Sequence, residues 1–272
     1  MTVLEVAAEL SYEVIDDTSF AFSVSAARNA NQMVMNELVE VSPNIEFTAT
    51  PYVDGKQLIR LDAAPGTLRL GYRATVSIED AAVGNVIGDE IPFSSIPPDV
   101  LPYLNPSRYC ESDKLGDFAW RHFGAVEPGY GRVEEISAWV GASILYSAGS
   151  TNASSSATDV LLERAGVCRD FAHVAIALCR ALGVPARYVS GYALGLEPQD
   201  FHGFFEAFLG GQWHLFDPTG MTTPNTMVRI GFGRDAADAP FAALVGRAEL
   251  VDKLVVVNIA DHLSPGCEGQ TS

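Results

Sequence analysis

The chain has few cysteines, and they form no pattern. Its 272 residues include four, at positions 110, 168, 179 and 267, and no two of them form a CxxC pair. Small secreted proteins that depend on disulfides have dense, paired cysteines, and a structural zinc site needs clustered ligands. The spacing fits neither class, so we expect free thiols.

Positive charge and long apolar runs are also scarce. Lys and Arg number 17 against 34 Asp and Glu, for a formal net charge of −17. Such a chain repels nucleic-acid phosphates and anionic membrane surfaces. No stretch approaches the roughly 20 apolar residues of a membrane span, and the first residues lack the features of a signal peptide. We expect no nucleic-acid or membrane partner, and a cytoplasmic location.

The composition is that of a globular protein, with 48% hydrophobic residues and enough chain for two modest domains. Short alternating runs, broken by turn pairs such as Asp54-Gly55 and Pro65-Gly66, predict an antiparallel β-sandwich-like domain over residues 1–92. A proline-rich stretch predicts a linker over 93–106. The prolines of this region are at positions 92, 97, 98, 102 and 106.

The pattern after the linker predicts a second domain over residues 107–262, with helices first and an antiparallel sheet second, and a mobile tail over 263–272. The overall class is therefore α+β. Apolar spacing predicts helices at 111–122 and 133–147, a short one from about Thr158, and another that has Cys168 in its first turn. Strand-like runs follow at 186–192, 204–209 and 213–217.

Cys168 has the position of an activated nucleophile. Unpaired NH groups and the positive end of the helix dipole favour a thiolate in the first turn of a helix. The same NH groups can bind the oxyanion of a tetrahedral intermediate. A cysteine that begins a helix is more often inert packing, however, so the prediction needs partner residues.

A predicted hairpin supplies those partners. If Gly210-Gly211 is a two-residue turn, Leu209 lies opposite Gln212 and, counting outward, His202 shares a face with Asp217. Such diagonal neighbours lie roughly 7 to 8 Å apart at Cα, so imidazole and carboxylate can meet. The other ring nitrogen can then exchange a proton with a thiol. We predict Cys168 as nucleophile, His202 as base and Asp217 as the orienting residue.

The remaining histidines and cysteines fit structural roles better. The same register places His214 on the opposite face of the hairpin, and His173 lies on a different face of its helix from Cys168. Cys179 lies among apolar helix residues and is expected in the core. A zinc site from Cys168, His173 and His202 matches no standard spacing, and we expect no metal.

The segments GVCRDFAH (166–173) and ALGVPARYVSGY (181–192) resemble the core of bacterial transglutaminase-like proteins, often described as candidate cysteine proteases. Residues 201–219 are similar to the family's histidine and aspartate segments, and 233–240 to its late motif. The early strands are similar to its N-terminal β-domain. The resemblance implies a papain/transglutaminase-like core and assigns Cys168, His202 and Asp217 the same catalytic roles.

The resemblance also suggests supporting residues. Tyr146, Asp170 and Phe204 are candidates for lining the cleft or supporting the oxyanion, with a core tyrosine as the alternative for Tyr146. Gly203 and Phe204 replace the family's usual alanine and bulkier aromatic after the histidine, and Ala236 replaces an aromatic in the late motif. We expect these departures to reshape the cleft without removing a catalytic group.

The predicted activity is attack by Cys168 on a side-chain amide or peptide carbonyl of a protein or peptide substrate. The acyl-thioester then passes to water or an amine, with hydrolysis slightly favoured. No oxygen-rich loop resembles a calcium cage, so we expect no cofactor. Two alternatives remain, a catalytically silent peptide-binding module of the same fold and acyl transfer from a thioester cofactor to an arylamine. The sequence leaves the oligomeric state open.

Overall fold

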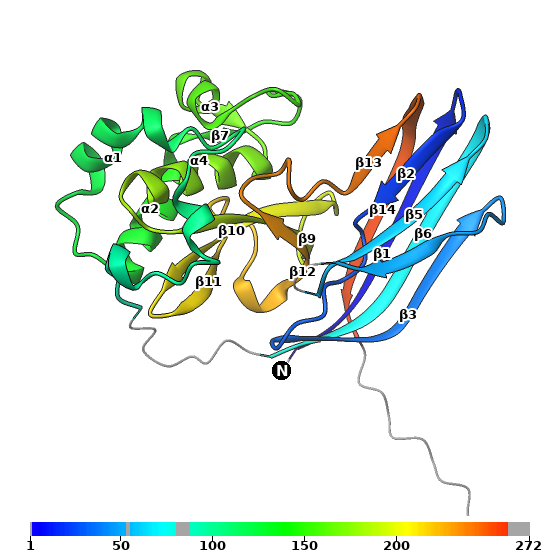
Figure 1. Ribbon diagram of the computed structural model, residues 1–272, viewed down its shortest axis with the longest axis horizontal. Helices are drawn as coiled ribbons and strands as arrows, with labels where there is room; N and C mark the ends of the chain where they lie inside the picture. The colour runs from blue at the N-terminus through cyan, green and yellow to red at the C-terminus, as the bar shows by residue number, and fades with distance from the viewer. Residues whose placement is uncertain (1, 53–54, 80–87, 261–272) are drawn as a thin grey trace, which may run out of the picture.

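The computed structural model describes residues 2–52, 55–79 and 88–260, which form two lobes (Figure 1). One lobe is built from long antiparallel strands. The other packs helices against a smaller antiparallel sheet, as expected for the predicted α+β class. The predicted tail at 263–272, with Cys267, lies outside the described residues, as does Asp54 of one predicted turn.

The β-lobe consists of two four-stranded sheets, in the orders β14-β1-β6-β3 and β13-β2-β5-β4. Alternate residues of β1 from Leu4 to Val14 are buried and pack with Phe20 and Ile59 of the second sheet, as in a sandwich. The strands are β1 (Thr2–Val14), β2 (Thr18–Phe22), β3 (Gln32–Ser42), β4 (Thr48–Pro51), β5 (Gln57–Ala63), β6 (Gly66–Ile78), β13 (Ala242–Val245) and β14 (Ala248–Ile259).

The chain returns to the β-lobe after building the other lobe. β14 pairs with β1 from Leu4↔Ile259 to Val14↔Ala248, and β13 pairs with β2. Residues from 242 onward, which were predicted within the second domain (107–262), therefore complete the N-terminal sheets. Local sequence patterns do not reveal pairing between strands so far apart in the chain.

The proline-rich stretch predicted as a linker packs against the second lobe. Phe93–Ser95 and Leu101–Leu104 form 3-10 turns, and Ile96 and Val100 are buried against Phe208. This segment packs on Phe208 and Trp213 in the sheet of the second lobe. Within the described part of the chain, no helix combines the length and apolar character needed to cross a membrane.

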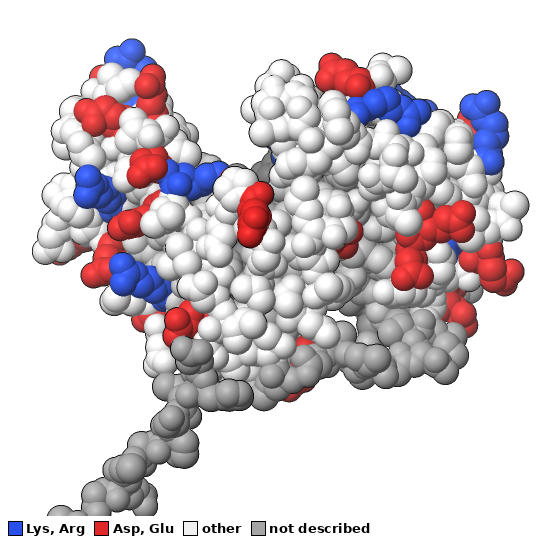
Figure 2. Space-filling model, turned by 180° about the vertical axis from the view of Figure 1, so that it is seen from behind, with Lys and Arg blue, Asp and Glu red and all other residues white. Residues whose placement is uncertain are grey.

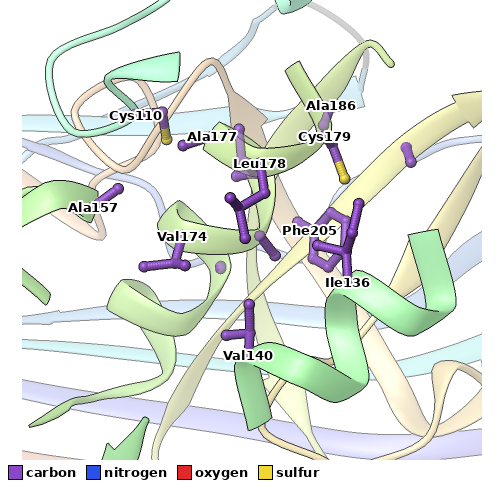
Figure 3. Packing of buried hydrophobic residues seen from close by; sticks show 14 of the residues in the cluster. Cys110, Ile136, Val140, Ala157, Val174, Ala177, Leu178, Cys179, Ala186 and Phe205 are labelled. Carbon is purple, nitrogen blue, oxygen red and sulfur yellow. The ribbon is translucent and has the colours of Figure 1, made fainter. Parts of the chain in front are cut away.

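The second lobe surrounds α4, whose residues from Asp170 to Arg180 are all buried. α4 packs between other helices and the sheet β11-β10-β9-β12, and Figure 3 shows Val174 and Leu178 among side chains of α2 and β10. Its elements are α1 (Gly116–Phe123), α2 (Tyr130–Ser143), β7 (Leu145–Tyr146), α3 (Ala157–Glu163), β8 (Ala165–Gly166), α4 (Cys168–Ala181), β9 (Ala186–Ala193), β10 (Phe201–Leu209), β11 (Gln212–Phe216) and β12 (Met227–Gly233).

Two predicted helices have different limits in the structure. The one predicted at 111–122 begins at Gly116, because Ser112–Lys114 is a 3-10 turn. The one predicted at 133–147 ends at Ser143, and Leu145–Tyr146 pairs with Ala165–Gly166 as a short parallel ladder. This ladder brings Tyr146 close to the start of α4.

Candidate active site

Cys168 is the first residue of α4 and is partly exposed. Asp170 holds this helix start: its carboxylate accepts hydrogen bonds from the Val167 N–H at 2.9 Å, from the Thr151 hydroxyl and from Arg169. Asp170 is fully buried and lies outside the cleft lining. The expectation that it lines the cleft or supports the oxyanion is therefore corrected, because its contacts are those of a helix-positioning residue.

The hairpin has the predicted register. β10 and β11 pair from Leu209↔Gln212 to Phe205↔Phe216. The His202 Nε2 lies 3.1 Å from Asp217 Oδ2, and the two side chains are 1% and 2% exposed. The other ring nitrogen is left for Cys168, which lines the same cleft as His202. The structure thus brings the three predicted residues together.

Asp217 is fixed by the turn that follows it. Its Oδ1 accepts from the Thr219 N–H and hydroxyl, and its Oδ2 accepts from the Thr222 N–H and hydroxyl as well as from His202. Burial raises the pKa of Asp217, but the hydrogen bonds from His202 and Thr219 outweigh it, and the net pKa is lowered. The carboxylate therefore stays ionised beside the imidazole.

The pKa of His202 is raised. Burial lowers its pKa, while the hydrogen bond with Asp217 and the influence of Cys168 raise it, and the net value is about 9. At neutral pH the ring is a cation next to the thiol. This arrangement suits a thiolate–imidazolium pair.

Tyr146 lies beside the nucleophile. Its hydroxyl interacts electrostatically with Cys168, and the residue is 42% exposed. Burial and the charge of Cys168 raise the pKa of Tyr146 to about 12, so the hydroxyl keeps its proton and can donate. The alternative of a core tyrosine does not fit this exposure.

Phe204, expected at the cleft, is instead a core residue. It is fully buried in a cluster with Val189 and Leu215. The neighbouring Gly203 does line the cleft, but a Cβ there would meet the Tyr188 hydroxyl at 2.6 Å. The departure at Gly203 therefore makes room for Tyr188, a cleft residue that the sequence did not single out.

A cleft of about 440 Å³ contains Cys168 and His202 and lies between the two lobes. Figure 2 shows a hollow between the lobes, and the charged groups on that face are scattered. A wider hollow of about 960 Å³ on the β-lobe contains none of the predicted site residues. We place the candidate site in the smaller cleft because the chemistry-bearing groups converge there.

The other histidines of this lobe are structural. The His214 ring lies 3.1 Å from the Leu209 carbonyl and contacts Tyr130, away from Cys168. His173 is fully buried in α4, and its Nε2 accepts the Ala236 N–H at 3.1 Å. That bond holds the 233–240 segment, part of which lines the cleft, over the nucleophile helix.

We expect protonation of His173 to destabilise the protein at low pH. Burial lowers its pKa to about 3, against about 6.5 in an unfolded chain. Between these values the unfolded chain binds one more proton, so the free energy of unfolding falls by about 1.4 kcal/mol per pH unit as the pH drops below 6.5. We expect His173→Gln to reduce this slope between pH 6.5 and 4.5, as measured by urea denaturation. The exposed His122→Gln is the control, and equal slopes in wild type and His173→Gln would contradict the assignment.

The described cysteines other than Cys168 are buried. Cys110 and Cys179 are free thiols with no exposed surface, and burial raises the pKa of Cys110 to about 12 and that of Cys179 further. Among the residues that the structure describes, no three His, Cys, Asp or Glu side chains are grouped to hold a metal ion.

Comparison with known proteins gives the family of both parts of the chain. Residues 118–218 match the model of the transglutaminase-like superfamily, and residues 2–98 match that of the bacterial transglutaminase N-terminal domain. A crystal structure from Cytophaga hutchinsonii, named "Putative Cysteine Protease", is 40% identical, with a TM-score of 0.90 over 97% of this chain and 92% of that one.

Two mycobacterial relatives match part of the chain. An uncharacterized protein of Mycobacterium leprae is 34% identical over 134 residues, which are 44% of this chain and 47% of the relative. One of Mycobacterium bovis is 32% identical over 153 residues, 50% of this chain and 48% of the relative. The matched region is thus about half the length of these curated relatives. The chain belongs to the transglutaminase-like superfamily and carries the bacterial N-terminal domain ahead of its core.

Proposed function

We propose that the protein is a cysteine-dependent amidase, protease or transamidase that acts on protein or peptide substrates through an acyl-thioester at Cys168. One observation carries this proposal. The buried His202 is hydrogen-bonded to an ionised Asp217 and lines the same cleft as Cys168, the first residue of α4. These are the contacts that an activated cysteine nucleophile requires.

The first half-reaction forms the thioester. The Cys168 thiolate attacks the amide carbonyl carbon, and the resulting oxyanion is met by the Tyr146 hydroxyl and the Cys168 N–H. As the C–N bond breaks, the His202 imidazolium donates its proton to the departing nitrogen, which leaves as ammonia or an amine. Asp217 keeps the imidazole in the orientation and tautomer needed for this transfer.

The second half-reaction releases the acyl group. The neutral His202 takes a proton from water or an acceptor amine, the oxygen or nitrogen attacks the thioester carbon, and the C–S bond breaks to restore the thiolate. Access of water decides between hydrolysis and transamidation. Because Cys168 is partly exposed in this cleft, we propose hydrolysis as the main outcome. The chemistry needs no cofactor.

Thiol labelling coupled to turnover tests the proposal. With a Cys267→Ser background, which removes the cysteine outside the described residues, iodoacetamide is expected to label Cys168 alone, because Cys110 and Cys179 are buried. The same protein should release ammonia from glutamine peptides or cleave peptide bonds, and Cys168→Ser should do neither. The matched control Cys110→Ala is expected to retain labelling and turnover.

Other results of the labelling and turnover measurements would lead to different conclusions. Equal labelling of all cysteines with no turnover would contradict an activated nucleophile. Selective labelling of Cys168 with no turnover of any amide would favour the silent peptide-binding module instead. Incorporation of a labelled amine at a rate above hydrolysis would replace hydrolysis by transamidation as the main outcome.

A further inference from the structure

The cleft that contains Cys168 has a second wall, and the β-lobe supplies it. On the nucleophile side lie Cys168, His202 and parts of the 233–240 segment. The facing wall is formed by side chains of β1, β14 and the segment entering β13. These are Leu10, Tyr12, Phe241, Ala242, Leu250 and Lys253. The N-terminal domain is thus part of the candidate site.

A β-bulge in β14 aims two of these side chains into the cleft. Tyr12 pairs with Leu250, but the preceding Ser11 pairs with Asp252, so β14 has one extra residue at this point. Without that residue, Leu250 and Lys253 would point to opposite faces of the sheet, since they are three positions apart. The bulge places both on the face of Leu10 and Tyr12. Bulges are frequent beside active sites for this reason.

The charges of the cleft are paired with one another. Lys253 lies 2.6 Å from the carboxylate of Asp200, which precedes the strand of His202. Arg169 lies 2.7 Å from Asp170. The Lys and Arg side chains that line the described cleft are therefore paired, and a charged substrate side chain would have to displace one of these pairs. An apolar side chain would not.

Leu250 offers apolar surface to such a side chain. It is 49% exposed although it faces a concave site, whereas Leu10 and Tyr12 beneath it are almost fully buried. We propose that this wall binds an apolar side chain of the acyl-donor peptide, next to the amide that Cys168 attacks. The inference rests on the proposed function and names its substrate class. Covering a leucine-sized side chain here corresponds to roughly tenfold or more in affinity.

The test compares glutamine peptides that differ only in their flanking residues, leucine or aspartate on both sides. Wild type is expected to prefer the leucine peptide in kcat/KM, through KM. Leu250→Asp should lower that preference about tenfold. The matched control is Leu254→Asp, because Leu254 lies on the same strand, is 53% exposed and pairs with Glu9 on the other face. It should keep the wild-type preference.

Two further measurements separate the subsite from the chemistry. Iodoacetamide labelling of Cys168 should be unchanged in both leucine variants, which shows that the nucleophile is intact. Binding of the two fluorescent peptides to Cys168→Ala, with and without Leu250→Asp, reports the subsite without any turnover. If the wild type binds the leucine peptide selectively but turns over neither peptide, the proposed activity is wrong and the subsite is still supported. An unchanged preference in Leu250→Asp, or an equal change in Leu254→Asp, would overturn the subsite.

Discussion

Asp217→Asn is expected to lower kcat on the order of a thousandfold while Cys168 remains in place. The amide nitrogen cannot accept from His202 Nε2–H, so the ring turns to the tautomer whose proton faces the thiol. A base in that tautomer cannot take the thiol proton. Steady-state turnover of a glutamine peptide measures the loss, and thermal denaturation shows whether the variant is folded.

The same variant should change the pH dependence. The pKa of His202 is about 9, so wild-type turnover is expected to fall as the pH rises past 9 and the imidazolium loses its proton. Removing the Asp217 carboxylate removes the hydrogen bond that most raises the pKa of His202, and the alkaline limb should move to lower pH. The raised pKa also stabilises the fold below pH 6.5, and this stabilisation is lost as the pH rises from 6.5 through 9.

Thr222→Val provides a milder comparison. It removes one hydroxyl that donates to Asp217 Oδ2 but leaves the carboxylate and the Thr222 N–H in place. We expect a loss of a few fold and a small shift of the alkaline limb. If Asp217→Asn kept kcat within threefold of wild type with an unmoved alkaline limb, the orienting role of Asp217 would be wrong.

Glu206→Gln is expected to produce the largest loss of stability. The Glu206 side chain is 2% exposed, and its two oxygens bind Arg187 and Arg229, each at 2.7 Å. The Arg187 guanidinium also lies 4.1 Å from the Trp213 ring and 3.7 Å from the Phe232 ring. Removing the shared anion leaves two nearly buried cations without a counter-charge, which costs about 3 to 5 kcal/mol.

This network links neighbouring strands of the catalytic sheet. Glu206 of β10 lies directly opposite Arg187 of β9, and Arg229 comes from β12 on the other side of β9. Burial raises the pKa of Glu206, but the two arginines outweigh it, so the net pKa is lowered. Its stabilising contribution is therefore present above the unfolded pKa and is lost as the pH falls through the folded value.

Urea denaturation at pH 7 measures the effect. The control is Asp16→Asn, which breaks the ion pair with Arg247, where both side chains are more than half exposed. We expect no measurable change for that variant, because exposed pairs contribute little. A Glu206→Gln variant less than 1 kcal/mol below wild type would contradict the prediction. Because Glu206 does not line the cleft of Cys168 and His202, turnover should fall with the folded fraction only.

The sequence determined those parts of the site that depend on local chain geometry. The helix that begins at Cys168 follows from its apolar spacing and from the Gly183 and Pro185 that end it. The approach of His202 to Asp217 follows from a two-residue turn, since the side-chain period of a strand leaves no freedom once the turn is set. Both predictions agree with the structure.

Tertiary structure decided which side chains surround these groups. Phe204 and Asp170 were expected at the cleft, but packing buries one and helix positioning occupies the other. The wall opposite Cys168 could not be predicted, because β14 reaches it only by pairing with β1 across almost the whole chain. Leu250 faces the cleft through a single extra residue in that ladder, which shows how long-range register, and not local pattern, shapes the proposed substrate subsite.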